Sequence, residues 1–175
     1  MVTPQARFQV LLEQNRAIVF KVAAIYANHV EDRKDLAQEI STQLWRSFSS
    51  YDESRGKFST WMYRIALNVA ISQARRQYGS LAEYTEPLDE HHLEIIGGGE
   101  PIAEQDERLT VLYAFIGQLG ALNRALILLY LEDRSYAEIA DILGISETNV
   151  ATKISRVKQK LRGQMTAAKT ITAGV

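Results

Sequence analysis

The sequence predicts an all-α protein of two small helical domains joined by a flexible acidic linker. Apolar residues recur at helical spacing in residues 5–78 and again in 106–163, and no segment shows the alternation typical of a strand. Residues 79–105 are rich in acids, Gly and Pro, which is typical of a linker. Residues 164–175 form a tail. The 175 residues, 46% of them hydrophobic, are enough for two such cores.

Charge is unevenly distributed along the chain, although the net charge is only −1. Residues 1–80 hold 11 Lys/Arg against 7 Asp/Glu, and residues 108–175 hold 9 against 5. Residues 81–107 hold 9 Asp/Glu and no Lys/Arg. Two basic blocks around an acidic one suggest a polyanionic partner for the ends of the chain. Ordinary solvated faces joined by a solvated tether explain the same pattern.

Three helices are expected in the first domain. The buried stripe of the first consists of Leu11, Leu12, Ile18, Val19, Val22 and Ile25. The second carries Leu36, Ile40 and Leu44 at four-residue spacing, and it starts with Glu31, Asp32 and Asp35, which suit the helix dipole. Ser59 is expected to cap a third helix that runs to about Arg76. Its inward residues are Trp61, Met62, Ile65, Ala66 and Val69.

The second domain begins with a helical stripe of Leu109, Leu112, Ile116 and Leu119. Gly120 interrupts this stripe, and the nearly all-apolar segment 121–131 that follows is expected to be the central helix. The stretch 135–162, SYAEIADILGISETNVATKISRVKQKLR, then predicts a helix-turn-helix.

The helix-turn-helix prediction rests on capping signals and on spacing. Ser135 and Glu138 form the S-x-x-E pattern of a capping box, Gly144 stands where the chain turns, and Ser146 can cap the second helix. In the first helix, Ile139 and either Ile142 or Leu143 are expected to face inward. The buried side of the second helix consists of Val150, Ile154, Val157 and Leu161, spaced four, three and four apart.

The opposite side of the second helix has the chemistry of a DNA-reading surface. Side chains that can reach base edges in a major groove are predicted at Thr148, Ala151, Thr152, Lys153, Ser155 and Arg156, with Gln159 beside them. Flanking cations suited to phosphates are Lys153, Lys158, Lys160 and Arg162. From Thr148 onward there are six Lys/Arg and no acid. A solvated amphipathic helix in a bundle remains the alternative.

Several functional classes find no support in the sequence. There is no Cys, no phosphate-binding loop and no catalytic motif, so we predict neither an enzyme nor a metal or cofactor site. His91 and His92 are adjacent, but they lie among solvated linker acids that nothing holds in place. No apolar run is long enough to cross a membrane, and no signal-peptide core is present, so a cytoplasmic location is expected.

Three segments together resemble a known family, the extracytoplasmic-function (ECF) sigma factors of bacterial RNA polymerase, within the sigma-70 family. The first is DRKDLAQEISTQLWRSFSSYD, similar to a region-two helix of D-L-x-Q-E followed by W-R. The second is GKFSTWMYRIALNVAISQARR, similar to F-x-x-W-L-x-x-I-A-x-N-x-A with a later R-R. The third is the helix-turn-helix, similar to region four. The sequence departs from the family at Leu67 and Ser72, where Arg and Asp are frequent, at Lys153, and at Gly120-Ala121.

The resemblance implies a division of labour between the domains. The first would dock on the clamp helices of core RNA polymerase and open the −10 element, the second would read the −35 element as duplex, and the linker would lie along the polymerase's inner channel. Polymerase contacts are implied at Asp35, Gln38, Glu39, Trp45 and Arg46. Contacts with the melted −10 strand are expected at Lys57, Phe58, Trp61, Arg64, Asn68 and Arg75, and Tyr63 offers a further ring. A core position for Trp61 or Trp45 stays open.

A sigma factor that directs promoter-specific initiation, with promoter DNA and core polymerase as partners, is therefore the leading interpretation. The family also implies an anti-sigma factor as a partner. The alternatives are a stand-alone helix-turn-helix regulator and a sigma-like adaptor without initiation activity. The region-two motifs favour the sigma factor, because a stand-alone regulator does not need them.

Overall fold

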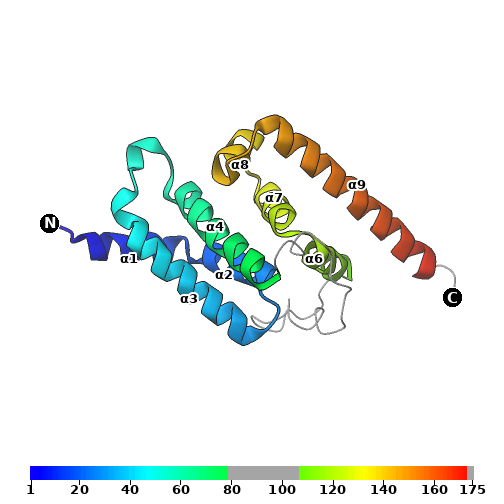
Figure 1. Cartoon of the computed structure of the whole chain (residues 1–175), viewed down its shortest axis with the longest axis horizontal. Coiled ribbons are helices and arrows are strands. Elements are labelled where there is room, and N and C mark those ends of the chain that lie inside the picture. Colours follow the sequence, from blue (N-terminus) through cyan, green and yellow to red (C-terminus); the bar gives the residue numbers. More distant parts are fainter. Residues whose placement is uncertain (79–106, 173–175) are drawn as a thin grey trace. The chain divides into compact units, whose positions relative to one another are not determined.

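The computed structural model describes residues 1–78 and 107–172. The chain divides into two compact units, Met1–Leu81 and Ala82–Val175. Figure 1 shows that both are built from helices, and no strand occurs in the described ranges. The all-α prediction is confirmed for this part of the chain. The predicted linker, residues 79–105, lies outside the described residues, and so do His91 and His92.

The first unit contains four α-helices: α1 (Pro4–Gln14), α2 (Arg16–Tyr26), α3 (Val30–Ser47) and α4 (Phe58–Tyr78). Two short 3-10 turns, η1 (Phe48–Ser50) and η2 (Glu53–Arg55), connect α3 to α4. Helices α2, α3 and α4 pack pairwise against one another. Their fully buried side chains include Val22, Leu36, Ile40, Leu44, Met62, Ala66 and Leu67. Each large apolar side chain buried in this way stabilises the fold by roughly 1.5–3 kcal/mol.

The first expected helix is in fact two helices. The chain breaks at Asn15, whose backbone leaves the helical region at φ −119° and ψ 12°. The amide of the Asn15 side chain donates to the Leu11 carbonyl at 2.9 Å and satisfies one of the oxygens that α1 leaves open at its end. Asn favours such local bonds over continuing a helix, which explains the break.

Helix α4 also differs from the expectation. It starts at Phe58, one residue before the predicted cap Ser59, and the Lys57 carbonyl accepts its first helical bond from the Trp61 amide. Met62 and Ala66 are buried as predicted, but Trp61, Ile65 and Val69 are only half-buried. The buried stripe includes Tyr63, Leu67 and Ala70 instead. The reason is that α4 packs on both α2 and α3, so its core-facing side is wider than one stripe.

The second unit consists, within the described residues, of α6 (Glu107–Gln118), α7 (Ala121–Leu131), α8 (Tyr136–Leu143) and α9 (Glu147–Thr172). Helix α7 is the central one, as predicted, because five consecutive residues from Ala125 to Leu129 are buried. It contacts α6, α8 and α9. Arg124 donates from its Nε and one Nη to the carbonyls of Leu119 and Gly117, at 2.7 and 2.6 Å, and so caps the end of α6.

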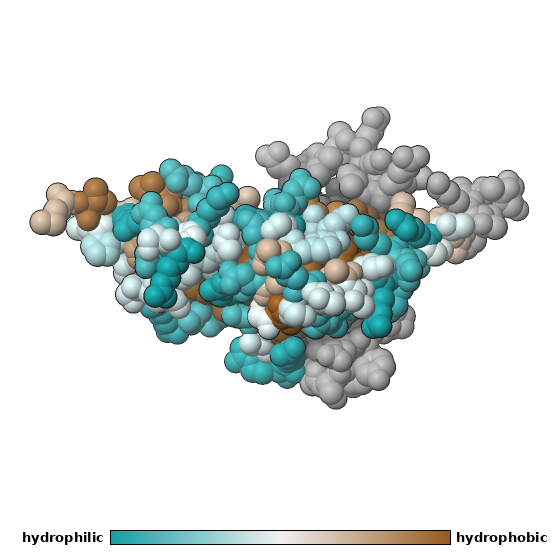
Figure 2. All heavy atoms as spheres, turned by 90° about the horizontal axis from the view of Figure 1, so that it is seen from above, coloured by the Kyte–Doolittle hydropathy of each residue, from teal (hydrophilic) through white to brown (hydrophobic). Residues whose placement is uncertain are grey.

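Helix α9 is longer than the predicted domain. It has 26 residues and continues through the expected tail to Thr172, roughly 39 Å at the usual rise per residue. Among the side chains described, up to Ala167, the buried ones are Val150, Ile154 and Val157, which lie in the first half of the helix. None of the described helices is both long and apolar enough to cross a membrane. The face of the molecule drawn in Figure 2 is hydrophilic over most of its described surface.

Candidate nucleic-acid interfaces

The turn between α8 and α9 is set by three local features, all of them predicted. Ser135 Oγ accepts from the Glu138 amide and Glu138 Oε2 accepts from the Ser135 amide, both at 3.1 Å, which completes the capping box. Gly144 ends α8 with φ +68°, a left-handed conformation that favours glycine. Ser146 Oγ accepts from the Asn149 amide at 3.1 Å and caps α9. These features fix the residue at which α9 begins and the orientation of α9 relative to α8.

One side of α9 is buried in the unit, and the opposite side, the proposed reading face, is exposed to solvent. Val150, Ile154 and Val157 are at most 3% exposed, whereas Leu161 is half-buried. Of the predicted reading residues, the structure places in solvent Thr148, Thr152, Ser155 and Arg156. Ala151 and Lys153 are half-buried at the edge of this face. Thr152 Oγ1 donates to the Thr148 carbonyl at 2.9 Å, so the hydroxyl offers an outside partner only its lone pairs.

Lys158 differs from the other cations of α9. Its Nζ lies 4.6 Å from the centre of the Tyr130 ring on α7, a cation–π contact within the unit. Lys160 and Arg162 are exposed. The phosphate contacts predicted for this helix therefore fall more naturally on Lys160 and Arg162 than on Lys158.

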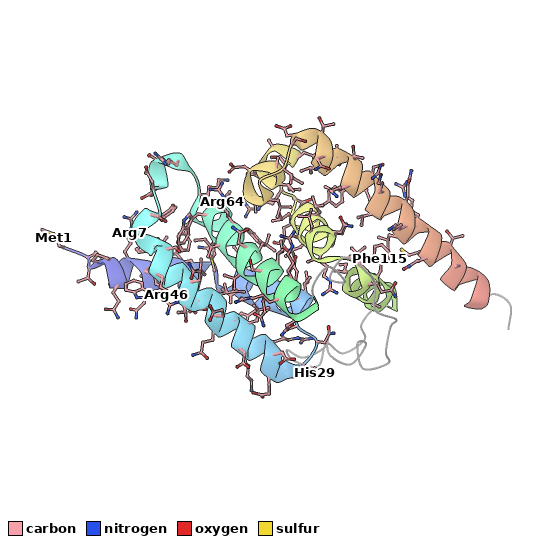
Figure 3. The ribbon with its side chains drawn as sticks, in the orientation of Figure 1. Met1, Arg7, His29, Arg46, Arg64 and Phe115 are labelled. Carbon is pink, nitrogen blue, oxygen red and sulfur yellow. The ribbon has the colours of Figure 1, made fainter. Side chains whose placement is uncertain are left out.

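In the first unit, α3 presents a polar face opposite its core stripe. Leu36, Ile40 and Leu44 are buried, while the structure exposes every candidate polymerase residue: Asp35, Gln38, Glu39, Trp45 and Arg46. At about 100° per residue these five positions share one side of the helix. Figure 3 labels Arg46 on this helix. Trp45 keeps 45% of its surface exposed, so it is not a core residue, although one side of its ring is packed.

Helix α4 presents a cationic face. It contains no acidic residue, and at about 100° per residue Arg64, Asn68 and Arg75 share one side with Lys57 and Trp61. Lys57, Asn68 and Arg75 are exposed, and Trp61 and Arg64 are half-buried. Figure 3 labels Arg64 near the start of this helix.

Two of the rings proposed for base stacking are enclosed by the fold. Phe58 is 6% exposed and Tyr63 only 1%, so neither offers a ring face to an unpaired base in this conformation. Their positions on α4 explain this: Tyr63 is in the middle of the core-facing side, and Phe58 packs under the preceding loop. Trp61, by contrast, is half-buried, so its ring remains partly accessible. Stacking by Trp61 accordingly stays a prediction.

Six aromatic rings form one connected cluster in this unit. Phe8 of α1 lies 5.2 Å from Trp45 and 5.1 Å from Phe48, measured between ring centres. Phe48 continues to Trp61 at 6.3 Å, and Tyr51 lies 5.3 Å from Trp61. Phe58 completes the cluster, 5.2 Å from Tyr51. Tilted and edge-on ring pairs at such distances add about 0.5–1.5 kcal/mol each beyond burial. The cluster joins α1, α3 and α4 below the loop between α3 and α4.

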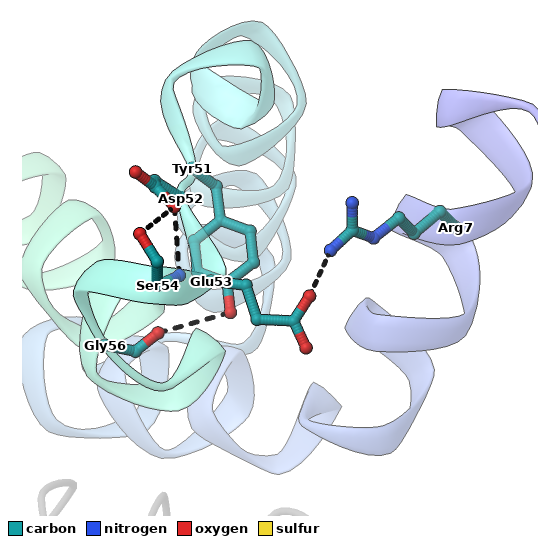
Figure 4. Close-up of polar contacts among 6 residues, drawn as sticks. All are labelled: Arg7, Tyr51, Asp52, Glu53, Ser54 and Gly56. Carbon is teal, nitrogen blue, oxygen red and sulfur yellow. Dashed lines mark hydrogen bonds and ion pairs between the residues drawn. The ribbon is translucent and has the colours of Figure 1, made fainter.

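The 51–57 loop above this cluster is held by a small set of polar contacts, shown in Figure 4. Asp52 Oδ1 accepts from the Ser54 amide at 2.9 Å and from Ser54 Oγ at 2.7 Å. These two bonds, with the hydroxyl bond the larger effect, hold the pKa of Asp52 below its usual value. The Tyr51 hydroxyl donates to the Gly56 carbonyl at 3.3 Å.

A further contact reaches the loop from α1. One Nη of Arg7 lies 2.7 Å from Glu53 Oε2, and both side chains are more than half exposed. An exposed pair of this kind stabilises a fold by no more than about 1 kcal/mol. Burial, then the charges of Glu53 and Asp52, raise the pKa of the Tyr51 hydroxyl, and Arg7 partly opposes that shift.

Sequence reasoning missed this part of the site. Arg7, Phe8 and Phe48 did not enter any candidate set, because the contacts of α1 with residues 37–46 positions later in the chain leave no periodic signal. One clue was present. Phe8, Trp45, Phe48, Tyr51, Phe58 and Trp61 hold most of the rings in residues 1–61, and rings in a small domain tend to pack together.

Comparison with known proteins agrees with this geometry. The family model described as sigma-70 region 2 matches residues 11–79, and that of sigma-70 region 4 matches residues 109–161. An ECF RNA polymerase sigma-E factor of Haemophilus influenzae is 30% identical over 83% of this chain and 82% of its own length. The ECF RNA polymerase sigma factor SigW of Bacillus subtilis is 28% identical over 84% and 82%. This chain belongs to the ECF sigma factors.

Solved structures support the fold of this sigma factor. The sigma factor RpoE of Bartonella quintana, solved with the anti-sigma factor NepR, has a TM-score of 0.70 at 19% identity, covering 91% of this chain and 97% of its own. CnrH, solved with the cytosolic domain of CnrY, has a TM-score of 0.61 at 21% identity, covering 93% and 90%. The function of an ECF sigma factor, promoter-specific initiation of transcription, follows from family membership.

Three further features of this sigma factor follow from the structure and the family match. Leu67, which stands where the family frequently has Arg, is fully buried, so here the position serves the core rather than DNA. Most of α1 precedes the region-2 match at residue 11, so Arg7 and Phe8 lie outside it. Within the described residues, no group of three or more His, Asp or Glu side chains is placed to hold a metal ion.

Proposed function

We propose that this sigma factor divides promoter recognition between its two units. The first unit would bind core RNA polymerase through α3 and the melted −10 strand through α4 and the 51–57 loop. The second would read the −35 element as duplex through α9. It would act by binding, without a catalytic step, in the cytoplasm where polymerase and promoter meet.

The observation that carries this proposal is the separation of charge between two helices of one core. The exposed face of α3 holds the acids Asp35 and Glu39, whereas α4 holds Arg64, Arg75 and Arg76 and no acid. Complementary potentials steer a surface toward a partner of opposite sign, so the two faces suit different partners. The acidic one, with the exposed Trp45 as an aromatic anchor, suits a protein, and the cationic one suits a phosphate backbone.

Duplex reading by α9 rests on a different set of properties. Its capped N-terminal half exposes hydroxyl, methyl and guanidinium groups of moderate length, the groups that recognise base edges in a major groove. Exposed Lys160 and Arg162 follow on the same helix and suit phosphates. Glu147, the first residue of α9, is an acid, but none follows from Thr148 to the C-terminus, so the rest of the helix does not repel the backbone of DNA.

An anti-sigma factor is part of the proposal. Two structural relatives were solved with such partners or with a cytosolic domain bound. A partner that covers the α3 face or the α9 face would block polymerase or promoter.

Run-off transcription tests the function directly. Core polymerase plus the purified chain, supplied with a pool of genomic promoter fragments, should yield transcripts that core polymerase alone does not. Absence of chain-dependent transcripts would favour an adaptor without initiation activity.

The docking face has its own test. Asp35→Arg with Glu39→Arg should abolish binding to core polymerase, measured by fluorescence anisotropy, because both acids reverse sign within the exposed face of α3. The control is Gln9→Arg with Glu13→Arg, two exposed residues at the same spacing on α1. Both variants should keep the helical circular dichroism of the parent. Equal affinity of the two variants for core polymerase would assign docking to another surface.

A further inference from the structure

The N-terminal helix α1 contacts the 51–57 loop from the side, and this contact has no role in the packing of the three-helix core. Arg7 comes from α1 and Glu53 from η2, 46 residues later in the chain. Figure 4 shows the guanidinium reaching across to the loop. An exposed ion pair such as Arg7–Glu53 contributes little to the global stability of the unit. Its main effect is therefore on the conformation of the 51–57 loop, to which Glu53 belongs.

Beyond the Tyr51 ring, which packs in the aromatic cluster at the start of the loop, the loop has few contacts with the rest of the unit. Residues 52–57 are all exposed, so no buried side chain anchors them. The bonds from Ser54 to Asp52 and from Tyr51 to Gly56 shape the loop internally, but they join the loop only to itself. A segment with few buried contacts opens locally at small free-energy cost. A tertiary contact at its middle, such as that from Arg7, narrows the set of conformations that it adopts.

The next residue of α1 ties the helix to the same region. Phe8 is 5% exposed, and its ring packs against Phe48 and Trp45 of the aromatic cluster. The cluster extends through Phe48 to Tyr51, the first residue of the loop, at 6.2 Å between ring centres. Phe8 therefore anchors α1 to the cluster. The anchored helix holds the Arg7 guanidinium within hydrogen-bond distance of Glu53.

We propose that α1 positions the 51–57 loop for single-stranded DNA, with Arg7 as the positioning residue acting through Glu53. This inference rests on the proposed function, because it assumes that the loop and α4 bind the melted strand. Arg7 itself need not touch DNA. Holding Glu53 also offsets the charge of an acid in the loop that would otherwise repel a phosphate backbone.

The experiment is a charge-swap series in the full chain. The variants are Arg7→Glu, Glu53→Arg and both together, in which the pair is restored with reversed polarity. The control is Arg16→Glu with Glu13→Arg, an exposed ion pair at 3.2 Å that joins the end of α1 to the start of α2 and does not involve the loop. Hydrogen exchange of amides 52–57 reports the loop. Anisotropy of a fluorescein-labelled 12-nucleotide single strand, selected by the parent chain from a random pool, reports DNA binding.

Arg7→Glu should speed exchange of the loop amides and weaken binding of the single strand, each by about two- to five-fold, the range of one exposed ion pair. The double variant should restore loop protection, and the control should change neither readout. DNA affinity of the double variant should recover in part, because position 53 then carries the cation. Core-polymerase affinity and the exchange of α2–α4 core amides should stay at parent values.

Two outcomes would overturn the inference. Unchanged loop exchange in Arg7→Glu means that the ion pair does not order the loop. Faster exchange of the loop amides with unchanged affinity for the single strand means that the conformation of the loop does not affect DNA binding. A parent chain that binds neither core polymerase nor any single strand contradicts the proposed function instead, and the exchange result still decides whether Arg7 orders the loop.

Discussion

The Lys158 ammonium of α9 lies over the Tyr130 ring of α7, 4.6 Å from its centre. The contact ties the cationic half of the reading helix to the central helix of its unit. It also distinguishes Lys158 from Lys160, two residues further along, which is exposed. Two lysines in one basic run thus have different surroundings.

Lys158→Gln should lower the free energy of unfolding of the second unit by about 0.5–1 kcal/mol, because the cation–π contact is lost. Native-state hydrogen exchange of the amides of Val150, Ile154 and Val157 measures it, since these residues are buried in that unit. Lys160→Gln serves as the control and should leave exchange unchanged. It should instead reduce the salt dependence of DNA binding by about one phosphate contact. If Lys158→Gln and Lys160→Gln had the same hydrogen exchange and the same salt dependence of DNA binding, the two lysines would not differ in role.

Arg156→Ala should weaken discrimination at the −35 element. Arg156 is exposed on the reading face of α9, and a bidentate contact to a base is worth about 1–3 kcal/mol. The measurement is affinity for a set of duplexes that differ at single positions of the selected site. Loss at one position marks base reading. An equal loss on every duplex would make Arg156 a phosphate contact.

Gly144 and Gly163 should respond to alanine with opposite signs. Gly144→Ala should destabilise the second unit by about 1 kcal/mol, because φ +68° is strained for a residue with a Cβ. Gly163 lies inside α9 with open space around it, so Gly163→Ala should stabilise the helix by roughly 0.5–1 kcal/mol. Hydrogen exchange of amides 150–157 measures the first change, and circular dichroism on heating measures the second. A stabilising Gly144→Ala would contradict the assigned turn.

Acid should loosen the 51–57 loop. The folded pKa of Asp52 is depressed by its bonds from Ser54, so its contribution is present above the unfolded value, near about 4, and is lost as pH falls through the folded value. Trp61, 5.3 Å from Tyr51, reports the loop by fluorescence in a Trp45→Phe background, which leaves it the sole tryptophan. Asp52→Asn should flatten the change between about pH 5 and 2. A transition that persists in Asp52→Asn belongs to another group.

Local signals in the sequence were sufficient to predict the second unit's turn. The capping box of Ser135, the glycine at 144 and the cap at Ser146 each act within four residues, so each leaves a readable pattern. The buried stripe of α9 was readable for the same reason, because one face packs on one neighbouring set of helices.

Contacts that depend on tertiary structure could not be predicted in this way. Helix α4 packs on two helices, which buries Tyr63 and Leu67 as well as the stripe that periodicity indicates. Phe58 suited a stacking role by residue type, yet it is enclosed by Phe48, Tyr51 and Trp61. The Arg7–Glu53 pair joins two exposed residues whose sequence contexts show nothing unusual. The proposed roles of the exposed faces on α3 and α9 stay predictions.

The core of the described residues contains no buried charged side chain. An apolar interior imposes volume and shape but few obligatory partners, so one aliphatic residue substitutes for another at small cost. Apolar substitutions in this core therefore cost little stability, in contrast to substitutions in cores that depend on a polar network. This tolerance accounts for a backbone shared with a sigma factor at 19% identity. It leaves natural selection free to act on the exposed faces, which under the proposed function distinguish one promoter from another.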